Sequence, residues 1–121
     1  MASKNEVRAI SESFAFGDIT AKKLGSLPAN ALILRAYAIV TTAFDSGTSN
    51  VIDIGISGTA ANFVNDIDVK TAAGAIAGTL VTTTVGVTSA TGSTEIYATH
   101  IPSGTAATAG ACNVVVEFMQ L

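Results

Sequence analysis

The feature that most constrains this chain is the stretch from Thr71 to Thr94, which contains no charged residue. Thr, Ala, Gly, Val and Ile fill it, and runs of β-branched residues favour extended backbone over helix. Over the whole chain 12% of residues are charged, whereas about a quarter is usual for a soluble domain. Neutral surface tends to associate. We therefore expect a β-rich module that packs against copies of itself or against a larger scaffold.

The uncharged stretch has the length of a membrane-spanning helix, but its composition argues against one. Glycines and many threonines dilute its apolar residues: Thr79, Thr82, Thr83, Thr84, Thr88 and Thr91. We expect no membrane span. The segment from Met1 to Ile10 is charged and lacks an apolar run, so we also expect no signal peptide.

The size, the cysteine content and the charge narrow the class of protein further. A length of 121 residues suits one domain. Cys112 is the one cysteine, so the fold does not depend on an internal disulfide, which is compatible with cytoplasmic production. The net charge is −3, and the basic residues near the N-terminus alternate with acidic ones. We therefore expect no nucleic-acid partner.

The clearest strand pattern runs from Ala31 to Thr42, where apolar residues recur at every second position. The pattern predicts one apolar face, formed by Leu32, Leu34, Ala36, Ala38 and Val40. Val51 to Ile56 alternates in the same way and places Ile52, Ile54 and Ile56 on one face. Period two over these lengths indicates strands rather than helices.

Further strands are predicted at regular spacing between turn residues. They are expected around Phe14 and Phe16, at Lys22 to Leu27, at Ala75 to Thr88, at Glu95 to Ile101 and at Ala111 to Met119. The segment from Asn62 to Lys70 is interpreted as a loop that leads into a short edge strand. Seven or eight strands without a convincing helix predict an all-β domain over residues 13–121, a sandwich or a barrel.

Residues 1–12 form a separate polar segment with mixed charge. Alone it has little apolar surface to bury, so we expect an N-terminal arm that becomes ordered on a partner. The candidate partner-binding residues are Lys4 and Arg8 for charged contacts and Val7 and Ile10 for apolar ones.

No combination of residues predicts catalysis. His100 is expected at the surface or at an interface, and one histidine cannot form the usual zinc ligand sets. Cys112 shares the inward parity of Val114, Val116 and Phe118, which predicts a buried, inert thiol. No local signature supports a Cys–His nucleophile pair, and no serine lies in the G-x-S-x-G context of an esterase.

Two acidic segments are candidates for metal ligation. Asp66 and Asp68 alternate near Asn62 and Asn65, which resembles part of a calcium loop without its glycine and terminal glutamate. Asp45 precedes turn residues and is interpreted as part of a turn. The glycine-bearing segment from Ile54 to Thr59 lacks the lysine of a phosphate-binding loop. We therefore expect no metal, no cofactor and no enzymatic activity.

The order of the elements carries a resemblance to a known group of proteins. Leu27-Pro28-Ala29-Asn30-Ala31 leads into the long apolar strand, and Thr42-Ala43-Phe44-Asp45-Ser46-Gly47 ends it. Ile54-Gly55-Ile56-Ser57-Gly58-Thr59 follows, and Thr108-Ala109-Gly110 precedes the closing strand with Val114-Val115-Val116-Glu117-Phe118. Over residues 27–121 this pattern resembles small virion proteins of tailed bacteriophages, similar to capsid decoration or cement proteins.

The resemblance implies a jelly-roll-like antiparallel sandwich that forms trimers on the capsid surface. The implied partners are further copies of the chain and the major capsid protein, and the implied location is the virion. Two other functions stay open at this point. One is a structural protein of the tail, baseplate or fibre, and the other is a carbohydrate-binding sandwich, for which Tyr37 and Tyr97 would be the aromatic candidates.

Overall fold

The computed structural model of the chain describes residues 6–57, 59–71, 73–80 and 92–120. These residues form eight β-strands and, within the described ranges, no helix. The strands are β1 (Val7–Ala15), β2 (Lys22–Leu27), β3 (Ala31–Thr42), β4 (Ser49–Ile56), β5 (Thr59–Asp68), β6 (Gly74–Ala77), β7 (Thr94–Ser103) and β8 (Ala111–Gln120). The predicted all-β class is confirmed.

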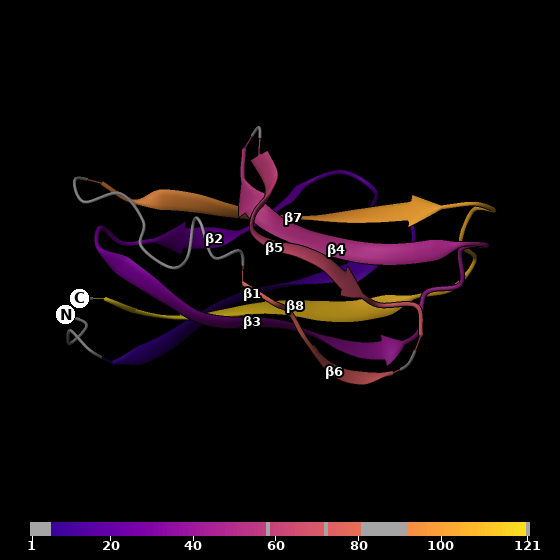
Figure 1. The fold of residues 1–121 in the computed structure, drawn as a ribbon, viewed down its shortest axis with the longest axis horizontal. Coiled ribbons are helices and arrows are strands. Elements are labelled where there is room, and N and C mark those ends of the chain that lie inside the picture. The colour runs from indigo at the N-terminus through magenta and orange to yellow at the C-terminus, as the bar shows by residue number, and fades with distance from the viewer. Residues whose placement is uncertain (1–5, 58, 72, 81–91, 121) are drawn as a thin grey trace.

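The strands form two antiparallel sheets of four that pack face to face (Figure 1). Sheet A has the order β1-β8-β3-β6, and sheet B has the order β2-β7-β4-β5. Consecutive strands mostly lie in opposite sheets, and β8 inserts between β1 and β3. This is the connectivity of an eight-stranded jelly roll, in which two Greek keys fold into one sandwich.

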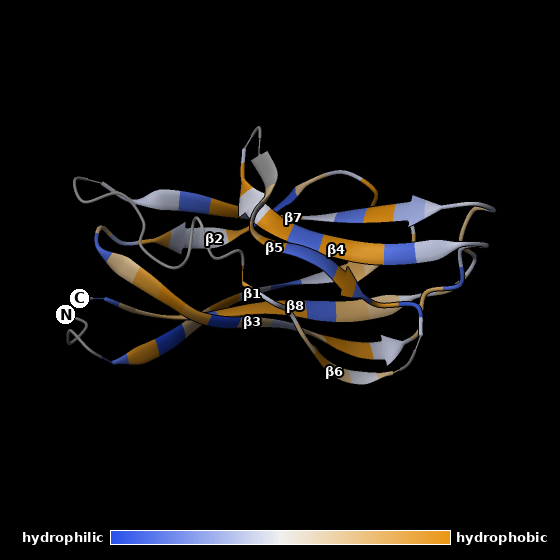
Figure 2. Cartoon of the chain, in the orientation of Figure 1, coloured by the Kyte–Doolittle hydropathy of each residue, from blue (hydrophilic) through white to orange (hydrophobic). Residues whose placement is uncertain are grey.

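The core lies between the two sheets and is built from alternate residues of each strand (Figure 2). In β8 the side chains of Cys112, Val114, Val116 and Phe118 point inward and are at most 4% exposed. Ile52 and Ile54 of β4 are fully buried opposite them, and Ile56 is half-buried. The predicted inward faces of β4 and β8 are confirmed, because period-two alternation places every second side chain on one face.

The predicted inward face of β3 is correct for only part of the strand. Ala36, Ala38 and Val40 are buried, but Leu34 is 37% exposed and Ile33 is buried instead of Leu32. The register explains the change, since Ile33 pairs with Phe118 while Arg35 pairs with the next residue of β8. Leu34 is therefore the extra residue of a β-bulge, which reverses the parity of the strand.

The predicted boundary between an arm and the domain at residue 12 does not match the strand pattern. Residues 7–12 belong to β1, which pairs with β8 from Val7 to Ala15, whereas the sequence predicts a strand only around Phe14 and Phe16. Residues 7–12 mix apolar and polar side chains, as is typical of a strand in an antiparallel sheet with one face toward solvent, and β1 is the edge strand of sheet A. Residues 1–5 of the expected arm lie outside the described residues.

Two other segments differ from the prediction. Residues 62–68, interpreted as a loop before a short edge strand, lie within the ten-residue strand β5 at the edge of sheet B. The strand expected from Ala75 to Thr88 is represented by β6, which ends at Ala77, and by a bridge between Leu80 and Val64. The remainder of that prediction, residues 81–88, falls outside the described residues.

The predicted surface position of His100 is wrong, because the side chain is 1% exposed. His100 lies on β7 with the same parity as Ile96 and Ala98, both fully buried. Its ring meets the ring of Phe44 edge to face, with centroids 4.7 Å apart. Desolvation explains why the pKa of His100 is lowered.

Candidate interaction surface

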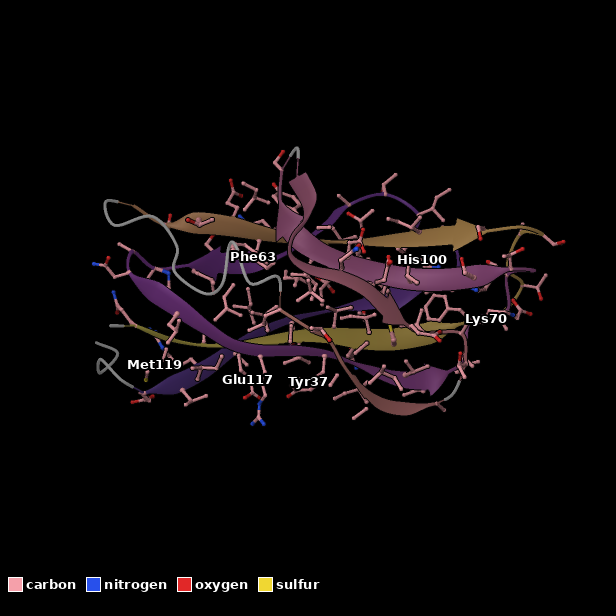
Figure 3. The ribbon with its side chains drawn as sticks, in the orientation of Figure 1. Tyr37, Phe63, Lys70, His100, Glu117 and Met119 are labelled. Atoms are coloured by element: carbon pink, nitrogen blue, oxygen red, sulfur yellow. The ribbon has the colours of Figure 1, made fainter. Side chains whose placement is uncertain are left out.

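The outer face of sheet A consists of the side chains that alternate with the core positions of its strands. The ladder register arranges them in rows across the sheet. The rows are Val7–Met119–Leu32, Ala9–Glu117–Arg35, Ser11–Val115–Tyr37–Ala77 and Ser13–Asn113–Ile39–Ala75. Figure 3 shows Tyr37, Glu117 and Met119 on the side of sheet A that faces away from sheet B. Within these rows the face is mostly apolar or small, with a single row that carries charge.

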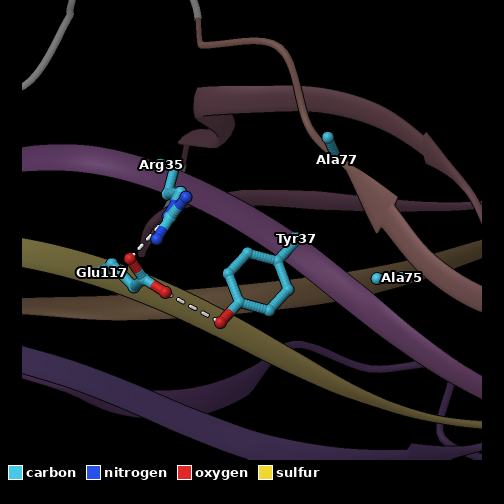
Figure 4. A pocket seen from close by; sticks show the side chains of 5 residues that line it. All are labelled: Arg35, Tyr37, Ala75, Ala77 and Glu117. Atoms are coloured by element: carbon cyan, nitrogen blue, oxygen red, sulfur yellow. Dashed lines mark hydrogen bonds and ion pairs between the residues drawn. The ribbon is translucent and has the colours of Figure 1, made fainter.

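The charged row contains one ion pair supported by a tyrosine (Figure 4). Nε of Arg35 donates to Oε1 of Glu117 at 2.6 Å, and the hydroxyl of Tyr37 donates to Oε2 at 2.9 Å. Hydrogen bonds from Arg35 and Tyr37 lower the pKa of the Glu117 carboxyl. Both carboxylate oxygens therefore have partners from β3, and the two charges cancel at the centre of the face.

The relief of the face comes from the bulge of β3 and from the short strand β6. Leu34, the bulged residue, and Ile39 are 37% and 40% exposed on this sheet. Beside them lies an open hollow of about 320 Å³, lined by Arg35, Tyr37, Ala75, Ala77 and Glu117. Because Ala75 and Ala77 have small side chains, β6 leaves space over Tyr37. We call this depression the Tyr37 hollow.

The outer face of sheet B has a different character. Lys23 pairs with Glu95 at 2.7 Å across β2 and β7. Asp53 lies on β4, and one of its carboxylate oxygens accepts a hydrogen bond from the backbone N–H of Asp66 at 2.8 Å. Desolvation raises the pKa of Asp53, and the charge of Asp66 adds to the increase. The two outer faces thus differ in charge, since sheet B carries Asp53, which is 6% exposed, and Asp66 in addition to one ion pair, whereas the rows of sheet A carry one ion pair.

A second apolar depression lies at one end of the sandwich, between the β1–β2 connection and the β7–β8 connection. It has a volume of about 270 Å³ and is lined by Phe16, Gly17, Ile19, Pro102, Ala106 and Ala107. Phe16 and Ile19 are 42% and 60% exposed. No sequence pattern predicts this surface, because its two halves are far apart in the chain.

The structure places the three described members of the predicted partner-binding group, Val7, Arg8 and Ile10, on different sides of β1. Val7 is 56% exposed on the outer face of sheet A, in the row that contains Met119. Arg8 points the other way, and its guanidinium carbon lies 5.1 Å from the centre of the Phe118 ring. Ile10 also points inward and packs so close to β2 that a Cβ on Gly25 would lie 2.9 Å from its Cγ2 atom. Lys4 lies outside the described residues.

The candidate catalytic groups do not form a site. Burial raises the pKa of the Cys112 thiol to about 11, so the thiol stays protonated at neutral pH and is a poor nucleophile. The His100 ring makes its side-chain hydrogen bond to Asn50, with 3.0 Å between Nε2 and Oδ1. Cys112 belongs to sheet A and His100 belongs to sheet B. The side chain bonded to the His100 ring is that of Asn50 and not the thiol of Cys112, and both His100 and Cys112 are buried in the core.

The acidic segments serve as turn anchors. Asp68 accepts hydrogen bonds from the backbone N–H groups of Lys70 and Thr71 at 2.8 and 3.1 Å. Asp45 accepts from the N–H groups of Thr108 and Ala109 at 2.7 and 3.0 Å. These bonds lower the pKa of the Asp45 carboxyl, and the pKa of Asp68 is lowered first by a hydrogen bond from the Thr71 hydroxyl and then by the N–H of Lys70. In the described part of the chain no three His, Cys, Asp or Glu side chains are grouped to hold a metal ion.

The described residues also include no helix of the length and apolarity needed to cross a membrane. The two tyrosines considered for sugar binding lie on different sheets. Tyr37 borders the hollow on sheet A, while Tyr97 lies on β7 beside a depression of about 340 Å³ on sheet B. They therefore do not form a joint aromatic platform.

Comparison with known proteins yields a structural likeness. No family model matches the sequence, and no curated protein matches it. Among solved structures, a chain of the cyanophage Pam1 capsid asymmetric unit is similar, with a TM-score of 0.72 and 18% sequence identity. The match covers 100% of this chain and 89% of that chain. At this identity the likeness shows a shared fold, the jelly roll described above.

Proposed function

We propose that the chain is a structural protein of a bacteriophage virion that decorates the head shell as a cement protein. One observation carries the proposal, namely that the whole chain matches a chain of the cyanophage Pam1 capsid asymmetric unit. The match leaves only 11% of that chain uncovered, so that chain is itself a small jelly roll. A small sandwich of this kind suits a protein added to a shell.

The surfaces of the molecule support a function based on burial rather than on chemistry. The outer face of sheet A and the depression at Phe16 and Ile19 offer exposed apolar side chains. Desolvated apolar centres with few charges are typical of stable interfaces between proteins. The proposed partners are the major capsid protein and further copies of this chain, in a homotrimer on the capsid surface. The proposal requires neither a catalytic residue nor a cofactor.

The residues predicted to contact a partner have different roles in this proposal, some at the surface and some within the sandwich. Val7 is the described member of the group that is available on the outer face of sheet A. Arg8 and Ile10 stabilise β1 against the sandwich, through Phe118 and Gly25. Lys4 precedes the strand and would contact the shell together with the rest of residues 1–5.

The test uses the phage whose genome encodes the chain, with this gene deleted. Purified protein is added to the resulting particles, and binding is measured by cosedimentation and by electron microscopy. We expect the mutant heads to assemble, to release DNA at a lower temperature than wild-type heads, and to regain stability when the protein binds. The reciprocal measurement is immunogold labelling of wild-type virions, for which we expect label on the head.

Two outcomes would overturn the proposal. Label on the tail, together with tailless or non-infectious mutant particles that have heads of normal stability, would identify a tail component. Absence of the chain from purified virions would remove any role as a virion protein. The supporting outcome is saturable binding to heads at a fixed number of copies per major capsid subunit.

A further inference from the structure

We propose that copies of this chain associate with one another through the outer face of sheet A. The inference deepens the proposed function and rests on it, because a decorated shell brings several copies together. The partner that we propose for this face is a second copy of the chain. Three properties of the described face argue for that partner, namely its charge balance, its relief and the position of its ion pair.

Charge distinguishes the two outer faces of the sandwich. In the four rows of sheet A the charged side chains are Arg35 and Glu117, and they neutralise each other. The outer side of sheet B carries the Lys23–Glu95 ion pair and, in addition, the 6% exposed Asp53 and the exposed Asp68 opposite Val51. Two copies in contact through sheet B would bring like charges together, which costs free energy. Two copies in contact through sheet A would not, so the neutral face suits an identical partner.

The face has both a projecting side chain and a depression, so the shape of one copy can fit that of another. Leu34 projects at the bulge of β3, and the Tyr37 hollow of about 320 Å³ lies on the β6 side of the same sheet. A leucine side chain can enter this hollow, where Tyr37, Ala75 and Ala77 offer apolar surface beside the Arg35–Glu117 ion pair. A rotation axis close to the face therefore allows Leu34 of one copy to occupy the hollow of the next. Such a repeated contact closes into a ring when the rotation permits it, as in a trimer.

The ion pair lies where such an axis would pass, between the β1–β8 half and the β3–β6 half of the face. Arg35 is 70% exposed along its side chain, whereas Glu117 is 15% exposed. Burial of unpaired charge is costly, but Glu117 already accepts hydrogen bonds from Arg35 and Tyr37. Around a threefold axis, pairs from three copies would place charges of alternating sign side by side. The Leu34 side chain of one copy would then lie beside an ion pair of the next copy whose carboxylate oxygens already have partners.

The experiment compares two isoleucines with the same exposure on opposite sheets. Ile39 is 40% exposed on sheet A, and Ile101 is 41% exposed on sheet B. Purified wild-type protein, Ile39→Lys, Leu34→Glu and Ile101→Lys are compared by sedimentation velocity over a range of concentrations. Circular dichroism and thermal melts show which variants are folded. We expect wild type and Ile101→Lys to form the same oligomer, and Ile39→Lys and Leu34→Glu to associate at least about tenfold more weakly.

A second measurement tests the contact directly if a charged variant fails to fold. Leu34→Cys and Ala77→Cys are each made together with Cys112→Ser, and the two proteins are mixed and oxidised with diamide. A disulfide between the two different chains is the expected product. As controls, Ile101→Cys and Thr99→Cys, both on sheet B, are made in the same background and mixed in the same way, and we expect them not to cross-link.

The other possible results distinguish failure of the proposed interface from failure of the proposed cement function. A monomeric wild-type protein at about 50 µM, or a folded Ile39→Lys variant that keeps the oligomer, would overturn the inference. If such a protein still decorated phage heads, the proposed function would stand without it. An oligomer that dissociates on substitution of Ile39 but never binds heads would support the interface and count against the cement function.

Discussion

Nε2 of His100 lies 3.0 Å from Oδ1 of Asn50 inside the sandwich, and both side chains are at most 1% exposed. The same oxygen accepts a hydrogen bond from the hydroxyl of Ser46 at 2.7 Å. The ring of Phe44 closes the cluster from one side. This contact joins β4 to β7 through polar atoms in an otherwise apolar interior, and burial of the ring favours the neutral form of His100.

We predict that the protein loses stability as the pH falls below about 6.5, because of His100. Burial lowers the pKa of His100 below 6.5, against the opposing effect of the carbonyl and the charge of Asp18. The unfolded chain then binds a proton at a higher pH than the folded chain does. The contribution to stability is therefore complete above pH 6.5 and is lost as the pH falls towards the folded pKa. Thermal melts across this range measure it.

The control for this prediction is His100→Gln, which keeps a hydrogen-bonding group beside Asn50 and does not titrate. Its melting temperature should be lower than that of wild type but nearly constant from pH 6.5 to pH 5. The carboxyl groups with lowered pKa values, such as Asp45 and Glu117, titrate below their ordinary values of 3.8 and 4.5. Their protonation therefore affects stability only at a lower pH than that of His100. An equal loss in wild type and variant would show that another group is responsible.

The comparison of sequence with structure shows which information is local. The bounds of β3 are those predicted, because alternation over its length is a local signal. The exposure of Leu34 was missed because the bulge depends on register against β8, far away in the chain. The burial of His100 could have been predicted, since it shares parity with Ile96 and Ala98. Its partner Asn50 could not, because their contact depends on the pairing of β4 with β7.

The same distinction applies to the interaction surface. The alternation of apolar and polar residues in β3 and β8 predicts that each strand has an outer face. The pairing of Arg35 with Glu117 joins positions 82 apart in the chain. No periodic pattern encodes such a pairing, because it arises only when β8 inserts between β1 and β3. The residues that form this surface can therefore be identified only once the strand order of sheet A is known.

Cys112 provides a second test, for which we expect slow labelling of the folded protein by a thiol reagent. The side chain is 4% exposed, and burial raises the pKa of the thiol to about 11. Cys112→Ser should lower the free energy of unfolding by roughly 1–3 kcal/mol, because a hydroxyl replaces an apolar contact in the core. Labelling that is as fast as in the denatured protein would contradict the burial.

Gly110 is predicted to be intolerant of a side chain. It adopts a φ of +151°, and a Cβ at this position would lie 2.5 Å from Cγ of Phe44. Gly110→Ala should therefore displace the Phe44 ring from the core and cost about 1–3 kcal/mol, as overpacking commonly does. Chemical denaturation measures the change. Gly17→Ala is the matched control, since a Cβ on Gly17 would extend into open space with no neighbouring atom within 4 Å, and equal losses in the two variants would contradict the explanation.

The last prediction separates the strand from the segment that precedes it. Deletion of residues 2–6 should leave the melting temperature nearly unchanged, because the ladder with β8 begins at Val7. Deletion of residues 2–10 removes the pairing of Val7 to Ile10 with Val116 to Met119. It also removes the contact of Arg8 with Phe118 and that of Ile10 with Gly25. We expect this second deletion to cost roughly 2–5 kcal/mol, from lost burial and lost ladder hydrogen bonds.

Binding of the two truncated proteins to phage heads completes this test. If residues 2–6 contact the shell, the shorter deletion should weaken binding at an unchanged melting temperature, and Lys4→Ala should reproduce part of the loss. Equal binding of the shorter deletion and wild type would remove any role for Lys4 and its neighbours. An unchanged melting temperature after the longer deletion would show that the first half of β1 contributes little to the sandwich, against the register and burial that assign it to the domain.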